Sequence, residues 1–202
     1  MKYIDLDEQK TAFIFELDNV IYPEKDYLFQ VYYFFAASME YVELIDAKTA
    51  TDLMVNTYFT DGKDAVFDAL QQKFDVDEKY RANFQQMMLN IKLPLKLLVY
   101  NSILELMQQI VVDRKRIFIV TNGDPEQQLN KIRQTEWNGL ENYLTCYFAN
   151  ELKPKPETDV IEKLIADNNL RRKDILMVGS SETDLLCAQN IGIDYLSVDT
   201  FL

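Results

Sequence analysis

The sequence predicts an α/β protein: a doubly wound parallel sheet that carries an inserted helical cap domain. Three observations predict this fold. Five short apolar runs have the length and composition of strands that are buried on both faces of a sheet. Helical patterns alternate with the later runs, as they do where helices connect parallel strands. About a hundred residues separate the first run from the second, far more than one crossover needs, and they show helical patterns without a clear strand.

The elements follow from these patterns in chain order. The apolar runs predict strands over Ala12–Phe15, Ile117–Val120, Cys146–Ala149, Ile175–Val178 and Tyr195–Val198. The helical patterns predict helices over Ser102–Ile110, Glu126–Arg133, Glu157–Asn168 and Thr183–Ile191. We expect residues 22–93 to form the helical cap, and residues 1–21 together with 94–202 to form the α/β core. The aromatic run Tyr32-Tyr33-Phe34-Phe35 is expected to pack inside the cap.

Composition and charge exclude several classes of partner. The formal net charge is −12 and there is no long Lys/Arg cluster, so we expect no nucleic-acid partner. No apolar run approaches the roughly 18 residues that a membrane span requires. The first ten residues are acidic and polar, unlike a signal peptide, and we expect a soluble cytoplasmic protein without a membrane partner.

The residue types limit the chemistry that is available. The chain has no His, which excludes an imidazole base and a His-ligated metal. Only Cys146 and Cys187 are present, and they lie far apart in the sequence, so neither a disulfide framework nor a cysteine zinc site is expected. The chemistry must therefore use carboxylates, Lys, Ser or Thr hydroxyls, or a cation bound by oxygen atoms.

Polar residues follow four of the predicted strands. Glu16 and Asp18 come after the first strand, and Thr121-Asn122-Gly123 after the second. Lys153 follows the third strand after a short loop, and the segment 179–184, Gly-Ser-Ser-Glu-Thr-Asp, ends the fourth. Ligands of open α/β sheets bind outside the carboxyl ends of the strands. The sequence therefore predicts that these four groups form one site.

Each group also has a purely structural explanation. Asp124-Pro125 is typical of a turn that starts a helix. Ser181 and Asp184 have the spacing of a capping box. The segment 153–156, Lys-Pro-Lys-Pro, fits an extended surface loop. A cluster of Lys and carboxylate side chains can also persist only as a partly buried ion-pair network.

Together the four groups resemble the motifs of the haloacid dehalogenase (HAD) superfamily. The resemblance is to phosphatases with a helical cap inserted just after the first motif, which is an apolar strand followed by Asp-x-Asp. It covers essentially the whole chain and implies a catalytic acid/base at Asp18 and a charge-stabilising Lys153. The resemblance also implies phosphoryl contacts from Thr121, Asn122 and Gly123, and Mg²⁺ ligation by Glu16, Asp18, Ser180 and Asp184.

Two departures from the family pattern touch the chemistry. Glu16 stands where the family has its nucleophilic Asp, and its extra methylene displaces the carboxylate by more than about 1 Å. A misplacement of about 1 Å can cost on the order of 100-fold in rate. Ser180 stands where the family has an acid that binds magnesium, and the loss of one anionic ligand weakens such a site. We therefore expect weak or absent Mg²⁺ binding. Alternatively, Glu16 or Glu182 takes over part of the coordination.

The resulting expectation is hydrolysis of phosphomonoesters of a small phosphorylated metabolite, with weakened chemistry. The alternative is a catalytically disabled relative that binds a ligand or a protein. The pair Ser180-Ser181 also resembles the magnesium-independent haloacid dehalogenases, a less favoured reading because these too need an Asp nucleophile. In the cap, Asp61-Gly62-Lys63 is a candidate substrate-contact loop or a plain turn between helices.

Overall fold

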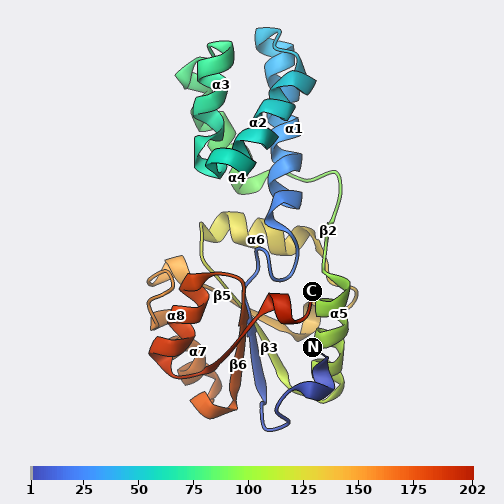
Figure 1. Ribbon diagram of the computed structural model, residues 1–202, viewed down its shortest axis with the longest axis vertical. Helices are drawn as coiled ribbons and strands as arrows, with labels where there is room; N and C mark the ends of the chain where they lie inside the picture. The colour runs from blue at the N-terminus through green and yellow to red at the C-terminus, as the bar shows by residue number, and fades with distance from the viewer. Residues whose placement is uncertain (1) are drawn as a thin grey trace. The chain divides into compact units, whose positions relative to one another are not determined.

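The computed structural model describes residues 2–202. The chain divides into two compact units, and Figure 1 labels most of their helices and strands. One unit comprises the residues up to Pro23 together with Leu97–Leu202, and the other comprises Glu24–Lys96. The first is the α/β core, and the second is the helical insertion.

The core is built on a parallel sheet of five strands in the order β5-β3-β1-β6-β7. The strands are β1 (Ala12–Phe15), β3 (Arg116–Thr121), β5 (Leu144–Phe148), β6 (Ile175–Gly179) and β7 (Asp194–Ser197). The predicted fold class and all five predicted strands are confirmed, with small shifts at the ends. Two short strands form a separate parallel pair that was not predicted, β2 (Leu97–Leu98) and β4 (Thr135–Glu136).

Four helices of the core connect these strands. They are α5 (Asn101–Val112), α6 (Pro125–Gln134), α7 (Asp159–Asn168) and α8 (Glu182–Ile191), and each overlaps a predicted helix. In Figure 1, α7 and α8 lie on one side of the sheet and α5 on the other. Helix α6 begins where the sequence indicated, because the Asp124 side chain accepts hydrogen bonds from the first backbone N–H groups and Pro125 occupies the first turn.

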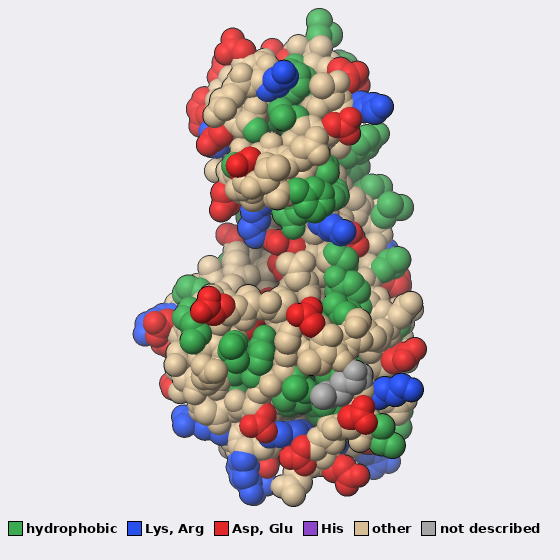
Figure 2. All heavy atoms as spheres, viewed as in Figure 1, with side chains coloured by type: hydrophobic (Ala, Val, Ile, Leu, Met, Phe, Trp, Pro, Cys, Tyr) green, Lys and Arg blue, Asp and Glu red, His purple; other side chains and the backbone are tan. Residues whose placement is uncertain are grey.

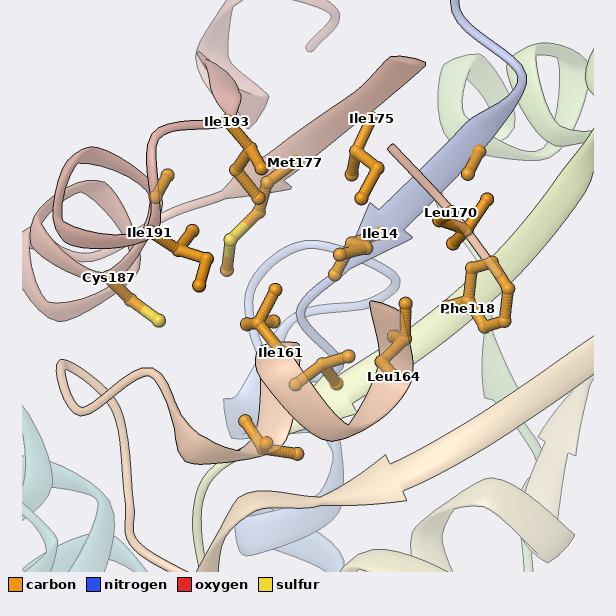
Figure 3. Packing of buried hydrophobic residues seen from close by; sticks show 14 of the residues in the cluster. Ile14, Phe118, Ile161, Leu164, Leu170, Ile175, Met177, Cys187, Ile191 and Ile193 are labelled. Carbon is orange, nitrogen blue, oxygen red and sulfur yellow. The ribbon is translucent and has the colours of Figure 1, made fainter. Parts of the chain in front are cut away.

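The hydrophobic core explains why the first strand is a continuous apolar run. Every residue of β1 is completely buried, as expected for a strand covered on both faces. Alternate residues of neighbouring strands, such as Ile14, Phe118 and Met177, point to the same face. There they pack against Leu164 of α7 and Cys187 of α8 (Figure 3). Burying one such side chain contributes about 1.5–3 kcal/mol.

The strand order positions the functional site. From β1 the chain adds β3 and then β5 on one side, and it adds β6 and β7 on the other side. The order therefore reverses between β1 and β6, at the sheet edge that receives Glu16 from β1 and Ser180 from β6. Ligands of doubly wound sheets bind at such a switch point, outside the carboxyl ends of the strands.

The second unit is entirely helical, with α1 (Glu24–Glu43), α2 (Ala47–Asp61), α3 (Val66–Phe74) and α4 (Arg81–Asn90). The predicted aromatic packing is confirmed for Tyr32 and Phe35, which are completely buried, and the Phe35 ring lies 4.9 Å from the Phe84 ring. Tyr33 is 57% exposed and lies outside this core. Within residues 2–202, no helix combines the length and the apolar composition that crossing a membrane would need.

The segment Asp61-Gly62-Lys63 forms the turn that ends α2. Gly62 has a φ of 87°, a left-handed conformation that glycine adopts without steric cost. The Lys63 ammonium lies 2.6 Å from the Glu24 carboxylate at the start of α1. These features fit a plain turn between helices, and a substrate contact by this turn stays a prediction.

Candidate active site

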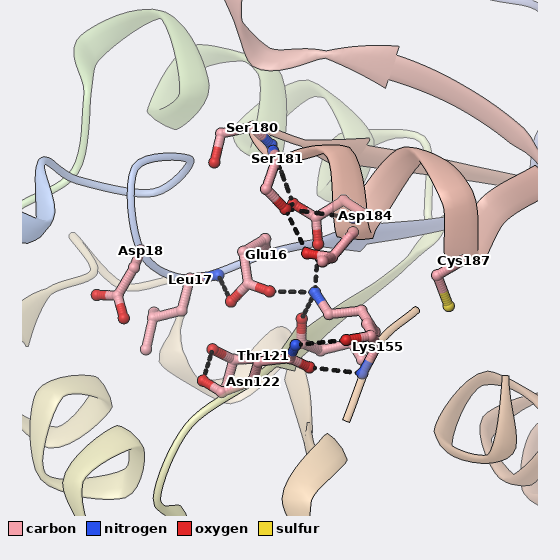
Figure 4. Close-up of polar contacts among 12 residues, drawn as sticks. Glu16, Leu17, Asp18, Thr121, Asn122, Lys155, Ser180, Ser181, Asp184 and Cys187 are labelled. Carbon is pink, nitrogen blue, oxygen red and sulfur yellow. Dashed lines mark hydrogen bonds and ion pairs between the residues drawn. The ribbon is translucent and has the colours of Figure 1, made fainter. Parts of the chain in front are cut away.

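Glu16 lies at the carboxyl end of β1 with its side chain pointing into the core unit. It is 8% exposed. One carboxylate oxygen accepts a hydrogen bond from the Lys155 ammonium, and the other accepts one from the backbone N–H of Leu17 at 2.8 Å (Figure 4). Both oxygens of the residue at the nucleophile position are therefore bound by protein donors.

Asp184, in the first turn of α8, shares the same lysine. Its Oδ1 lies 2.5 Å from the Lys155 Nζ. Its Oδ2 accepts hydrogen bonds from the Ser181 hydroxyl at 2.7 Å and from the backbone N–H groups of Ser180 and Ser181 at 3.1 Å. The capping box predicted from the sequence is present, and the same carboxylate completes the ion pair. Asp184 therefore serves both as a capping residue of α8 and as an ion-pair partner of Lys155.

A glycine permits this close approach. A Cβ atom on Gly179 would lie 2.5 Å from the Asp184 Cβ, a separation that real Cβ atoms do not tolerate. The last residue of β6 therefore has to lack a side chain if the start of α8 is to bring its carboxylate over the strand end.

The lysine of this cluster is Lys155 and not Lys153, which corrects the sequence prediction. Lys155 is 3% exposed, whereas the side chain of Lys153 is 62% exposed and forms an ion pair with Asp159 at 3.1 Å. The Asn122 side chain fixes the loop through the Lys155 backbone: Lys155 N–H donates to Asn122 Oδ1 at 2.9 Å, and Asn122 Nδ2 donates to Lys155 O at 3.0 Å. Each lysine precedes a proline, so the local pattern could not separate them.

Asp18 lies apart from the group around Lys155 (Figure 4). Its Oδ2 accepts a hydrogen bond from Lys131 Nζ at 2.6 Å and another from Gln128 Nε2 at 3.0 Å. Its Oδ1 accepts one from the Tyr22 hydroxyl at 3.1 Å. The two acids of the first motif are therefore each paired with a different lysine.

Gln128 and Lys131 were missed by the sequence analysis. They lie three residues apart on α6, so they share one face of the helix. Their exposed fractions are 1% and 2%, although Leu129 and Ile132 are the apolar residues of this stretch and only half-buried. A hydrophobic pattern places apolar side chains inward, so it gives no sign of a polar face that is turned toward a site.

The residues expected to contact a phosphoryl group are engaged with the protein. The Thr121 hydroxyl accepts a hydrogen bond from Gln128 Nε2 at 2.7 Å and donates to the Asn122 carbonyl oxygen at 3.2 Å. Gly123 has a φ of 113°, and its N–H donates to Asn150 Oδ1 at 3.0 Å. These residues line the end of β3, and their contact with a phosphate stays a prediction.

Burial and charge set the ionisation of the cluster. Burial raises the pKa of Glu16, and Asp184 adds to this, although Lys155 and a hydrogen bond with Thr121 oppose it. Burial opposes ionisation of Asp184, but Lys155 and Ser181 hold its pKa below the usual value. Burial likewise opposes the charge on Lys155, but the carboxylates of Glu16 and Asp184 raise its pKa. A single ammonium thus serves two carboxylates, and Glu16 is the weaker acid of the two.

The donor set does not fit a tight magnesium site. Mg²⁺ needs oxygen ligands in near-ideal octahedral geometry, usually with one or two carboxylates. Within the described range 2–202, no group of three or more His, Cys, Asp or Glu side chains could hold a metal ion. Glu16 and Asp184 are held by Lys155, Asp18 is held by Lys131, and Ser180 offers only a neutral hydroxyl. The expected ligands Glu16, Asp18, Ser180 and Asp184 thus lie at one sheet edge without forming a metal cage.

Comparison with known proteins agrees with this architecture. Residues 13–198 match the model of a protein family described as haloacid dehalogenase-like hydrolases. The chain belongs to this family. Its HAD core explains the doubly wound sheet and the order of the four polar groups along the chain. No curated protein matches the sequence.

Solved structures of HAD proteins share the fold at low sequence identity. The HAD-hydrolase YfnB from Bacillus subtilis, in a structure described as bound to magnesium, has a TM-score of 0.60 and 16% identity over 92% of this chain and 85% of its own. A HAD-superfamily hydrolase of subfamily IA from Geobacter sulfurreducens has a TM-score of 0.57 and 16% identity, covering 94% and 87%. L-2-haloacid dehalogenase from Xanthobacter autotrophicus has a TM-score of 0.53 and 15% identity, covering 92% and 76%. At these identities the likeness concerns the fold alone.

Proposed function

We propose that this HAD protein binds a small phosphorylated metabolite and hydrolyses its phosphomonoester slowly. One observation carries the proposal: Glu16, Lys155 and Asp184 form a buried, hydrogen-bonded cluster at the switch point of the sheet, and Asp18 follows two residues after Glu16. This is the place where doubly wound folds bind their ligands. The carboxylates and the ammonium are the groups that phosphoryl transfer to a side chain requires.

In the proposed reaction, a carboxylate oxygen of Glu16 attacks phosphorus and forms an acyl phosphate while the bond to the leaving oxygen breaks. Asp18, ionised in its pair with Lys131, takes a proton from the monoanionic phosphomonoester and passes it to the leaving oxygen. It then takes a proton from the water that attacks phosphorus and releases Glu16, and loses that proton to the solvent. Lys155 offsets the charge of Glu16 and of the transferred group. No step is assigned to a metal, since the residues do not form a magnesium cage.

Three features are expected to make this reaction slow. The side chain of Glu16 is longer than that of Asp, so its carboxylate lies in a different position. A misplacement of about 1 Å can lower the rate on the order of 100-fold. The raised pKa of Glu16 reduces the fraction that is ionised and able to attack. Protein donors already bind the oxygens of both Glu16 and Asp18, so a substrate has to compete with them.

The same occupied oxygens favour a second candidate function, a catalytically disabled relative that keeps the site for binding. In that case Glu16, Lys155 and Asp184 stabilise the carboxyl ends of the strands, and a phosphorylated ligand or a protein binds there without turnover. A haloacid dehalogenase activity has no comparable support, because that reaction also needs an Asp at position 16.

A panel of phosphorylated metabolites, assayed with and without magnesium, separates the two candidates. The wild type is compared with the double variant Glu16→Asp/Ser180→Asp, which restores the family pattern, and with Glu16→Gln as an inactive control. Slow wild-type turnover that Glu16→Gln abolishes supports the enzyme. Activity only in the double variant supports the disabled relative. Wild-type turnover above about 1 per second, within the usual range for enzymes, would contradict both.

The proposed partners follow from the same chemistry. We place the protein in the cytoplasm with a small anionic metabolite, and we propose neither a nucleic acid nor a membrane as a partner. The net charge of −12 argues against a nucleic-acid partner, as do the Asp and Glu side chains that are spread over both units on the face shown in Figure 2. With such a surface, an anionic substrate has to be held by direct contacts in the site, because the long-range field of the protein repels it.

A further inference from the structure

We propose that Lys131 is a positioning residue: it neutralises Asp18 and so allows the site to accept an oxyanion such as phosphate. This inference rests on the proposed function, because it concerns the binding of the phosphoryl group at the same site. It assigns a role to a residue that neither the motifs nor the resemblance indicated.

The contacts of Lys131 support this role. Its side chain is 2% exposed, and its Nζ lies 2.6 Å from Asp18 Oδ2. Taking an ammonium group out of water is costly unless it is paired and hydrogen-bonded. An apolar residue would fill this position of α6 at lower cost, because it carries no charge that has to leave water. A buried lysine here is therefore explained best by the carboxylate that it contacts.

Gln128 supports the same arrangement from the preceding turn of α6. Its Nε2 donates to Asp18 Oδ2 at 3.0 Å and to Thr121 Oγ1 at 2.7 Å. The amide thus joins the acid of the first motif to the hydroxyl of the second. Gln128 and Lys131 both donate to Asp18 Oδ2, so they hold this carboxylate at α6, and each acid of the first motif keeps its own cation.

The charge of the site shows why the second lysine matters. Glu16, Asp18 and Asp184 supply three carboxylates, and Lys155 and Lys131 supply two ammonium groups, so one net negative charge remains when all are ionised. Without Lys131 the net charge would be two negative units, and the exposed side of Asp18 would repel an arriving anion. At the effective dielectric constant of a partly buried site, one unit charge a few ångströms away changes affinity by more than about tenfold.

A double-mutant cycle distinguishes this electrostatic role from a structural one. Binding of inorganic phosphate is measured by isothermal titration calorimetry at low ionic strength for wild type, Lys131→Met, Asp18→Asn and the double variant Asp18→Asn/Lys131→Met. Thermal denaturation verifies that each variant is folded. Lys163→Met, which removes an exposed lysine paired with Asp167 at 3.0 Å, is the charge-matched control and should bind like wild type.

The inference predicts an order of affinities. Lys131→Met should bind phosphate at least about tenfold more weakly than wild type. Asp18→Asn should bind more tightly than wild type, because it leaves the ammonium without its carboxylate. The double variant should return close to wild type, because it removes both charges. If Lys131→Met does not fold, Asp18→Asn is compared with the double variant. Asp18→Asn keeps the Lys131 ammonium, so it must bind phosphate more tightly than the double variant.

Two results would overturn the inference while the proposed function stands. One is wild-type phosphate affinity in Lys131→Met. The other is a double variant that binds as weakly as Lys131→Met, which would show that Lys131 acts through the fold and not through the charge of Asp18. A wild type that does not bind phosphate at all would overturn the proposed function and this inference together.

Discussion

Replacing Lys155 by Met should strongly destabilise the core unit, whereas replacing Lys153 by Met should leave its stability unchanged. The two lysines are two residues apart and each precedes a proline, yet their surroundings are opposite. Lys155 is buried between Glu16 and Asp184. Lys153 pairs with Asp159 in contact with solvent.

The magnitude follows from what the substitution leaves behind. Removing one partner of a buried ion pair costs about 3–5 kcal/mol, because an uncompensated charge stays in the interior. The raised pKa of Glu16 allows it to take up a proton and so relieve part of this cost. Asp184 keeps its hydrogen bonds with Ser181 and the backbone. We therefore expect a loss near the lower end, about 3 kcal/mol, for Lys155→Met.

Urea unfolding followed by circular dichroism measures this loss. With an m-value of roughly 2–3 kcal/mol/M, a loss of about 3 kcal/mol lowers the midpoint by about 1–1.5 M. Glu16→Gln in the Lys155→Met background should recover part of the midpoint, since it removes one of the two buried carboxylates that have lost their ammonium partner. An equal loss of midpoint in Lys153→Met and Lys155→Met would contradict a stabilising role for the buried ion pair, as would a loss below about 0.3 M in Lys155→Met.

Three further predictions concern the same cluster. Because the pKa of Glu16 is raised in the folded state, that state binds a proton more readily than the unfolded chain, and this contribution to stability grows as the pH falls toward about 4.3. Glu16→Gln should remove this gain in urea midpoints between pH 8 and 5, and an unchanged pH slope would contradict the assignment. Gly179→Ala should cost about 1–3 kcal/mol by thermal melting, because its Cβ would crowd Asp184, and a wild-type melting temperature would show that the helix start can move. Millimolar magnesium should raise the melting temperature of Glu16→Asp/Ser180→Asp but not of the wild type, and an equal rise in both would show that the present ligands suffice.

The elements of the sheet could be predicted from the sequence because each strand is buried on both faces. The run Ala12–Phe15 is apolar throughout, and its bounds in the structure are those that the pattern indicated. The helix starts at Asp124-Pro125 and at Ser181 could also be predicted from the sequence, because capping residues form hydrogen bonds with the backbone next to them. Such features depend on a few neighbouring residues, and the sequence therefore contains them directly.

The parts of the site that could not be predicted depend on contacts between distant segments. Lys155, and not Lys153, enters the site because the Asn122 side chain, more than thirty residues earlier, forms hydrogen bonds with the Lys155 backbone. The pairing of Asp18 with Lys131 joins the end of β1 to α6 and so brings together residues 113 positions apart. Neither contact leaves a periodic or local pattern, so only the folded chain reveals them.

The double use of Asp184 has a consequence for how this site comes into being. One oxygen stops the backbone of α8 from fraying, while the other holds the lysine. The charged centre can therefore form only when the first turn of that helix has closed, and local melting of the turn would release Lys155 at the same moment. The rate of hydrogen exchange at the amides of Ser181 and Asp184 would then measure how often the first turn of α8 opens and, with it, how often the ion pair with Lys155 is broken.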